Sequence, residues 1–141
     1  DLHLKDFAIQ QGTYFSVNYL EGENTPLLYI YVPATNSIIE ENVLLYGHFD
    51  KQPWGLGWDE DKKPNVPIVE NNRLYGRGSA DDGYSIYAFL LAIKTIRDLN
   101  GSHPKIHILI EGAEESGSPD MSKYLEMLSV LFINLENNNY T

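Results

Sequence analysis

The sequence predicts an α/β fold, a three-layer sandwich with a mostly parallel central sheet. Short apolar runs at residues 27–32, 43–46 and 106–110 have the length of buried strands. A segment with helical periodicity, residues 84–99, lies between the last two of these runs. Strands that alternate with helices along a chain favour layered packing around a largely parallel sheet. The 141 residues suffice for one domain with its own core.

The first part of the chain is expected to form a helix and then strands. Residues 2–11 suggest a short amphipathic helix that a glycine ends. Residues 14–20 alternate apolar and polar side chains, which indicates a strand followed by a turn. The runs at residues 27–32 and 43–46 are almost continuously apolar, so we expect both strands inside a sheet that is covered on both faces.

A long loop and a hairpin are expected next. Residues 51–67 contain several Pro, Gly and Asp residues and both tryptophans, which indicates a loop. Long loops without regular structure are often functional in compact domains. Residues 68–70 and 73–75 flank Asn71 and Asn72, a pair that suits the tight turn of a β-hairpin.

Two helices and two strands are expected in the rest of the chain. In residues 84–99, large apolar side chains share one helix face; they are Ile86, Phe89, Leu90, Ile93 and Ile96. Residues 106–110 are strongly β-prone, and residues 130–135 predict a last strand. Between these strands a helix is expected to begin near residues 118–120, with the apolar face Tyr124, Leu125 and Leu128.

The composition excludes several classes of protein. The chain is 43% hydrophobic and 21% charged, which is ordinary for a globular protein, and its formal charge of -10 argues against a nucleic-acid or anionic-membrane partner. No cysteine is present, which excludes disulfides and thiolate metal sites. No apolar run is long enough to span a membrane, and the start has neither an initiator Met nor a signal-peptide pattern. We therefore expect a cytoplasmic protein whose N-terminus has been cut or processed.

The first of three acidic motifs, Gly-His-Phe-Asp at residues 47–50, directly follows a predicted strand. In open α/β sheets, sites form beyond the carboxyl ends of the strands. His48 suits a metal ligand, since neutral imidazole binds zinc well. Asp50 lies two residues on and points the same way in extended backbone, so it suits acceptance of the other ring N–H. For this pair alone, an ordinary strand-end histidine is the more common explanation.

The second motif spans residues 76–83 and contains Asp81 and Asp82. The two aspartates stand between a glycine-flanked turn and the start of the long predicted helix. A carboxylate at this place can bridge two cations, with one oxygen on each. The alternative is an aspartate that caps the helix and interacts with its dipole, and for this motif alone that alternative is slightly favoured.

The third motif, at residues 111–118, contains Glu114 and Glu115 directly after the strongest predicted strand. Adjacent carboxylates point in different directions, so one can bind a metal while the other faces a water as general base. Glu-Glu pairs alone are common on solvated surfaces. The conjunction of three such motifs at strand ends, with glycines around them, predicts a hydrolytic metal centre.

These motifs carry a resemblance to a known family. The sequence Leu-Tyr-Gly-Arg-Gly at residues 74–78 leads into Asp81 and Asp82, and the stretch at residues 111–118 is equally specific. The chain resembles the carnosinase–aminoacylase group of zinc metallopeptidases and amidohydrolases, most firmly over residues 43–128. That group includes dipeptidases, acetylornithine deacetylase and succinyl-diaminopimelate desuccinylase. The resemblance implies hydrolysis of a peptide or N-acyl amide bond with two Zn²⁺, Co²⁺ or Mn²⁺ ions in the full-length active site.

The resemblance also implies a role for each site residue. His48 matches a terminal ligand of one metal, Asp81 matches the bridging carboxylate, and Glu115 matches a further metal ligand. Asp50 matches the aspartate that supports the histidine, and Glu114 matches the general base.

Some features depart from the pattern of the family. Many relatives have Lys after the Asp-Asp pair, where this chain has Gly83, and both this position and Lys51 resemble a less studied bacterial-type branch. The family's next acidic ligand has Glu136 as its nearest counterpart, at a spacing that is short. The family's last histidine ligand lies downstream of these residues. The resemblance further implies a cis peptide bond between Asp81 and Asp82.

Residues 1–141 are therefore expected to be the N-terminal part of a single zinc-hydrolase catalytic domain, an incomplete one without the lid or dimerisation domain. We expect a small peptide or acyl-amino-acid substrate, and a homodimer is open for the full-length protein. One alternative is an N-acyl amino-acid deacylase with the same site. Another is a truncated or degenerate chain without turnover, and this fragment alone is expected to be inactive.

Overall fold

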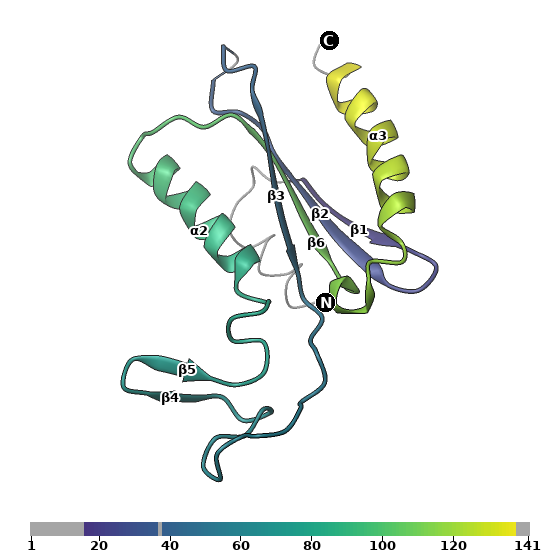
Figure 1. The fold of residues 1–141 in the computed structure, drawn as a ribbon. Coiled ribbons are helices and arrows are strands. Elements are labelled where there is room, and N and C mark those ends of the chain that lie inside the picture. Colours follow the sequence, from purple (N-terminus) through teal and green to yellow (C-terminus); the bar gives the residue numbers. More distant parts are fainter. Residues whose placement is uncertain (1–15, 37, 138–141) are drawn as a thin grey trace.

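The computed structural model describes residues 16–36 and 38–137, so the helix expected at residues 2–11 lies outside the described part. A four-stranded sheet forms its centre (Figure 1). In spatial order the strands are β1 (Ser16–Glu21), β2 (Pro26–Val32), β6 (Lys105–Glu111) and β3 (Asn42–His48). The hairpin expected after the long loop is confirmed as β4 (Ile68–Glu70) and β5 (Arg73–Tyr75).

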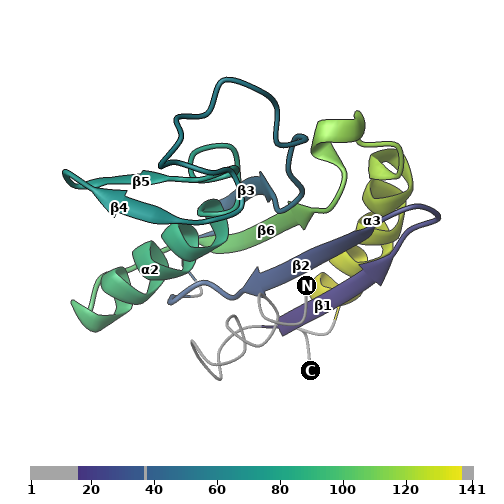
Figure 2. The ribbon, with the colours of Figure 1, turned by 90° about the horizontal axis from the view of Figure 1, so that it is seen from below.

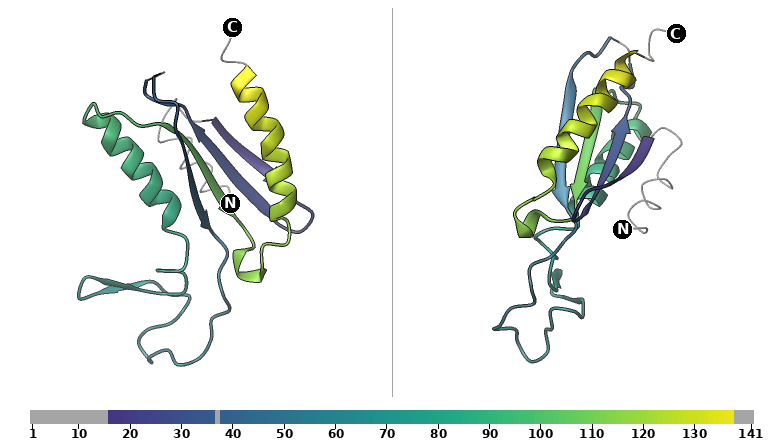
Figure 3. Two further views of the ribbon diagram at one scale, coloured as in Figure 1. Left: turned by 45° about the horizontal axis from the view of Figure 1, so that its top comes forward. Right: turned by 90° about the vertical axis from the view of Figure 1, so that its right-hand side faces the viewer.

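Two α-helices of the described residues lie on opposite faces of this sheet (Figures 1 and 3). They are α2 (Ser85–Asp98) and α3 (Met121–Asn137), and a short 3-10 helix, η1 (Glu114–Ser116), precedes α3. A mixed sheet with a helix on each face fits an α/β fold. Neither helix has the length and apolar character needed to cross a bilayer, a finding that covers the described residues.

The face of the sheet toward α2 holds the larger part of the core. Alternate residues of β2 and β6 point to this face and meet one side of α2. The buried side chains are Leu28, Ile30, Val32, Ile86, Leu90, Ile93, Ile106, Ile108 and Ile110. Each side chain of this kind contributes about 1.5–3 kcal/mol when it is fully buried.

The opposite face packs against α3. Its buried side chains are Leu27, Tyr29, Leu109, Tyr124 and Leu128. Since β2 contributes to both clusters, its nearly continuous apolar run is explained by burial on both faces. Leu125 was expected on the apolar face of this helix, but its side chain is half exposed.

The expectation of a mostly parallel sheet is wrong for the described strands. The pair β3 and β6 is parallel, whereas β1 with β2 and β2 with β6 are antiparallel. A four-residue turn at residues 22–25 joins β1 to β2, and so short a connection reverses the chain direction. The connection from β3 to β6 contains α2, the kind of long crossover that a parallel pair requires.

The strand expected at residues 130–135 is also wrong. This segment continues α3, which begins at Met121 and extends to Asn137. A short apolar run fits a buried strand or a helix equally well by its pattern alone. Here a helix is already in progress, so each further residue adds a hydrogen bond without a new nucleation cost.

Strand β3 is less covered than expected. Val43, Leu44 and Tyr46 are exposed, although this run was expected inside a sheet covered on both faces. The physical reason is position, because β3 is the edge strand of the described sheet and pairs with β6 on one side. Its buried end, Gly47 and His48, is the part that reaches the site.

Candidate metal centre

The three motifs meet at one edge of the sheet, where β3 and β6 end (Figure 2). The two strands are parallel, and His48 pairs in register with Glu111. Phe49 donates its backbone N–H to the Glu111 carbonyl at 2.9 Å, which keeps the chains together just beyond the strands. The loop before α2 brings Asp81 of the second motif to the same place, so that Asp81 lies next to His48 of the first motif.

His48, Asp81 and Glu115 converge as expected. One ligand atom from each residue lies within 4.8 Å of the others. The His48 side chain is 7% exposed and that of Asp81 is 78% exposed, so the group opens toward solvent on the Asp81 side. The assigned roles of these residues remain predictions.

Both ring nitrogens of His48 face carboxylates. Nδ1 lies 3.2 Å from Asp50 Oδ1, while Nε2 lies 3.1 Å from Asp81 Oδ1 and 3.8 Å from Glu114 Oε2. If Nδ1–H donates to Asp50, the lone pair of Nε2 is on the side of the ring that faces Asp81. Burial by itself lowers the pKa of His48, but the hydrogen bond to Asp81 and the charges of Asp50, Glu114 and Asp82 raise this pKa by more, above its ordinary value.

Asp50 connects the first motif to the third. Its Oδ1 accepts the backbone N–H of Glu114 at 3.2 Å, and its Oδ2 accepts the backbone N–H of Glu115 at 3.0 Å. The same carboxylate accepts from His48. Sequence reasoning assigned Asp50 the support of the histidine and missed its hold on η1, because a contact between residues 50 and 115 leaves no local pattern.

Asp82 has a structural role, and Asp81 faces the site. Asp82 Oδ2 accepts the backbone N–H of His48 at 3.2 Å, and Oδ1 accepts those of Gly83 at 2.5 Å and Ser85 at 3.3 Å. Burial alone raises the Asp82 pKa, but hydrogen bonds from Ser85, Gly83 and His48 lower it further than that, below its ordinary value. The alternative of an aspartate that caps the helix is met only in part, since Asp82 accepts the N–H of Ser85, the first residue of α2, but the N-cap position is Tyr84.

The cis peptide bond implied between Asp81 and Asp82 is wrong for this structure. The described residues contain no cis peptide bond. The trans form is the expected one on energetic grounds, since a non-proline cis bond costs about 3–4 kcal/mol.

One oxygen of the Glu115 carboxylate is placed as a cation ligand would be. Its Oε2 accepts the Gln52 side-chain amide at 2.6 Å, whereas its Oε1 is buried and has no hydrogen-bond partner among the described residues. A buried carboxylate oxygen without a partner is costly. A divalent cation shared with the neighbouring Asp81 would satisfy it, and carboxylate oxygens together with an imidazole nitrogen such as that of His48 are usual zinc ligands.

Glu111 is a buried acidic residue to which sequence reasoning assigned no role. Its side chain is 2% exposed, and Oε1 accepts the Ser118 hydroxyl at 2.8 Å and the Tyr46 hydroxyl. Burial, and then the Glu111 carboxylate, raise the pKa of Tyr46. Glu111 is the last residue of β6, and its carboxylate therefore holds Ser118, at the far end of the turn that carries Glu114, beside Tyr46 of β3.

A cavity of about 350 Å³ adjoins the converging residues. His48 and Asp81 line it together with apolar and aromatic side chains, among them Tyr46, Tyr84 and Phe89. This arrangement offers room for a small molecule beside the carboxylates. The combination of a concave apolar surface with a few polar groups is typical of ligand sites.

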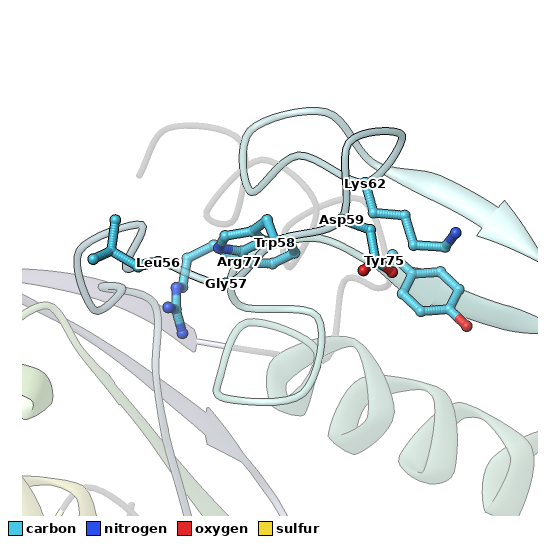
Figure 4. A pocket seen from close by; sticks show the side chains of 7 residues that line it. All are labelled: Leu56, Gly57, Trp58, Asp59, Lys62, Tyr75 and Arg77. Carbon is cyan, nitrogen blue, oxygen red and sulfur yellow. The ribbon is translucent and has the colours of Figure 1, made fainter.

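The expected long loop is held to the hairpin around a second cavity of about 320 Å³ (Figure 4). Arg77 lies over the Trp58 ring, 5.9 Å from its centroid, and Lys62 lies 5.1 Å from the centroid of Tyr75. These cation–π contacts fix the loop beside the motif that leads to Asp81.

Glu136 does not follow a strand as the family pattern requires. It lies in the last turn of α3, which starts beside η1 and leads away from the site edge (Figure 1). A helix of 17 residues is about 25 Å long. The described structure therefore gives no support to Glu136 as a metal ligand.

Comparisons with known proteins identify relatives of this chain. The profile of "Peptidase family M20/M25/M40" matches residues 44–139. The chain is 38% identical over 87 residues to Beta-Ala-His dipeptidase of Homo sapiens, covering 60% of this chain and 17% of that protein. It is 40% identical over 81 residues to succinyl-diaminopimelate desuccinylase of Nitrosomonas europaea, covering 55% of this chain and 21% of that protein.

A solved structure shows the same fold. The M20 family metallo-carboxypeptidase Sso-CP2 from Sulfolobus solfataricus matches with a TM-score of 0.75 and 28% identity, covering 89% of this chain and 28% of that one. The chain spans about a fifth of the length of the curated relatives named above. The family profile covers more than half of this chain and includes the site residues from His48 to Glu115. The chain therefore belongs to peptidase family M20/M25/M40.

Proposed function

We propose that this chain is part of a metal-dependent hydrolase that cleaves a peptide or N-acyl amide bond. The observation that carries the proposal is the convergence of His48, Asp81 and Glu115, whose ligand atoms lie within 4.8 Å of one another. Family membership supports the same class of reaction. The intact catalytic domain would be a three-layer sandwich to which these residues contribute one part.

Two divalent ions, zinc in the first instance, are proposed for the intact site. His48 would serve one ion and Glu115 the other, and the largely exposed carboxylate of Asp81 would bridge them. Their remaining ligands would come from outside the described residues. When bound, such ions supply Lewis acidity that polarises an amide carbonyl and favours ionisation of a water.

Glu114 is proposed as the general base. Its carboxylate lies 3.8 Å from His48 Nε2, beside the converging group but outside the three-residue ligand set. Asp50 fixes its backbone N–H, which orients the turn. Glu114 would accept a proton as water oxygen bonds to the carbonyl carbon, and would return that proton to the leaving nitrogen as the C–N bond breaks.

The substrate class has two candidates that the relatives favour about equally. One relative is a Beta-Ala-His dipeptidase, which supports a dipeptide substrate for this protein. Another is a succinyl-diaminopimelate desuccinylase, which supports an N-acyl amino acid. Both candidates present an amide carbonyl next to a carboxylate-bearing residue, so one metal site can serve either.

The test is a hydrolysis screen on the intact protein with dipeptides and N-acyl amino acids. The expected result is turnover of one class that EDTA abolishes and added Zn²⁺, Co²⁺ or Mn²⁺ restores. Metal analysis by mass spectrometry accompanies the assay. A protein that is folded and metal-loaded yet hydrolyses neither class would favour the degenerate, non-catalytic alternative.

A further inference from the structure

The Lys51 side chain spans the gap between the first and second motifs. Its Nζ donates to the backbone carbonyls of Phe49 at 2.9 Å and Asp50 at 3.4 Å, both just beyond β3. It also donates to the carbonyl of Asp82 in the loop before α2. An ammonium group has three donors, and here three carbonyl oxygens from two separate segments surround it.

Two glycines make room for this side chain. Gly78 has φ +80°, and a Cβ placed there would overlap with Cδ and Cε of Lys51. Gly83 has φ +147°, and a Cβ there would lie 2.8 Å from Lys51 Nζ. The alkyl stem of Lys51 thus runs along the backbone of the second motif, and its ammonium group lies beside Gly83.

We infer that Lys51 is a positioning residue that holds Asp81 at the distance from His48 that metal binding requires. This inference rests on the proposed function. The Asp81 side chain is 78% exposed, so its position depends mainly on the backbone of its loop. Lys51 fixes that backbone at the next residue, Asp82, against the two residues that follow His48.

The contacts of Lys51 complement those of the Asp82 carboxylate. The Asp82 side chain accepts the His48 N–H at 3.2 Å and so ties the loop to β3 from one direction. The Lys51 ammonium holds the Asp82 carbonyl from another. Charge-assisted bonds of this kind are short and directional. Together these two contacts hold the side chain and the backbone carbonyl of Asp82, the residue next to Asp81.

The experiment measures Co²⁺ binding to the intact protein by the visible d–d absorption of the ion. Lys51→Met keeps the apolar stem and removes the ammonium. It should weaken Co²⁺ binding by about 10- to 100-fold, as loss of a group that orients ligands does, and should change the absorption bands. Circular dichroism checks that the variant is folded.

Chemical rescue separates positioning from general destabilisation. The 141 residues contain no cysteine, so Lys51→Cys introduces the single thiol of this part of the protein. Alkylation with 2-bromoethylamine then rebuilds an ammonium-bearing side chain of almost the original length. Co²⁺ affinity and spectrum should return toward those of the wild type, which is treated identically as the control.

Gly78→Ala offers a second variant with a matched control. It should weaken Co²⁺ binding because its Cβ displaces the Lys51 stem. Gly57→Ala carries similar backbone strain, with φ +87°, but its Cβ would meet no atom within 4 Å, and it should leave Co²⁺ binding unchanged. Wild-type affinity and spectrum in Lys51→Met would overturn this inference alone, whereas a wild-type protein that binds no Co²⁺ would overturn the proposed function as well.

Discussion

Asp50 holds Glu115 in place, since its Oδ2 accepts the Glu115 backbone N–H at 3.0 Å. The other oxygen of the same carboxylate contacts His48 Nδ1 and the Glu114 N–H, each at 3.2 Å. One carboxylate therefore orients the proposed histidine ligand, the proposed acidic ligand and the proposed base. The separate motifs become one site through this residue.

Asp50→Asn should weaken zinc binding by about 10- to 100-fold. The groups around the carboxylate that point at it are N–H donors, so an amide NH₂ would face a donor in either orientation. Isothermal titration with Zn²⁺ measures the change. Asp61→Asn is the control, because Asp61 lies on the surface and pairs with Lys62. Equal zinc affinity in the Asp50→Asn variant and the wild type would contradict the role given to Asp50.

Glu114→Gln should lower kcat by at least roughly 10²-fold while metal content stays near that of the wild type. The reason is that Gln cannot accept the proton, whereas the proposed metal ligands are unchanged. Glu115→Gln should instead lose metal. Metal analysis and steady-state kinetics on the intact protein separate the two results. Loss of metal from Glu114→Gln, with an unchanged rate per bound metal, would mean that the two glutamates have exchanged roles.

Leu128→Ala should destabilise the fold by about 2–5 kcal/mol, since Leu128 is fully buried between α3 and the sheet. The matched control is Leu125→Ala in the same helix, where the side chain is 50% exposed and the change should be within about 0.5 kcal/mol. Urea denaturation gives both values. Similar losses in the two variants would contradict the packing described for α3.

Asp120 should make the stability depend on pH. Its carboxylate accepts the backbone N–H of Asn24 at 2.7 Å and of Thr25 at 3.0 Å, and these bonds lower its pKa. A depressed pKa in the folded state contributes stability above the unfolded value of about 3.9, and this contribution is lost as the pH falls through the folded value.

The stability difference between wild type and Asp120→Asn is therefore expected to be constant from pH 8 to pH 5 and to shrink below about pH 4. Urea midpoints at several pH values measure this difference, and the comparison cancels most effects of the other carboxylates. A difference that stays constant down to pH 3 would show that the Asp120 carboxylate is not what anchors α3 to the β1–β2 turn.

The convergence of His48, Asp81 and Glu115 could be predicted because each stands at a recognisable boundary. His48 and Glu115 follow apolar runs, and Asp81 precedes a helix with clear periodicity. Such boundaries at the carboxyl end of a sheet bring residues together whatever the details of the loops. Because β3 and β6 are adjacent and parallel, their carboxyl ends bring the site residues together, even though the other strand pairs of the sheet are antiparallel.

The end of the chain was harder to predict. The run at residues 130–135 is apolar and short, so its pattern fits a strand as well as it fits a helix. The packing of Tyr124 and Leu128 against the sheet decides in favour of the helix, and that packing depends on β2 and β6 far away in the sequence. Tertiary context of this kind is absent from a local pattern.

The role of Lys51 also lies beyond a local pattern. The sequence shows Lys51 and Gly83 as two separate departures from the family pattern. The structure places the Lys51 ammonium where a Cβ on Gly83 would lie 2.8 Å from it. A long side chain that reaches across two loops is set by the shape of those loops, and the sequence alone does not specify that shape.

The most direct test of the metal centre is anomalous diffraction at the zinc edge from crystals of the zinc-loaded intact protein. Two peaks about 3.5–4 Å apart are expected, with Asp81 between them. His48 Nε2 and a Glu115 oxygen should each lie about 2.0–2.2 Å from one peak. Bound zinc with none of His48, Asp81 and Glu115 among its ligands would contradict the account.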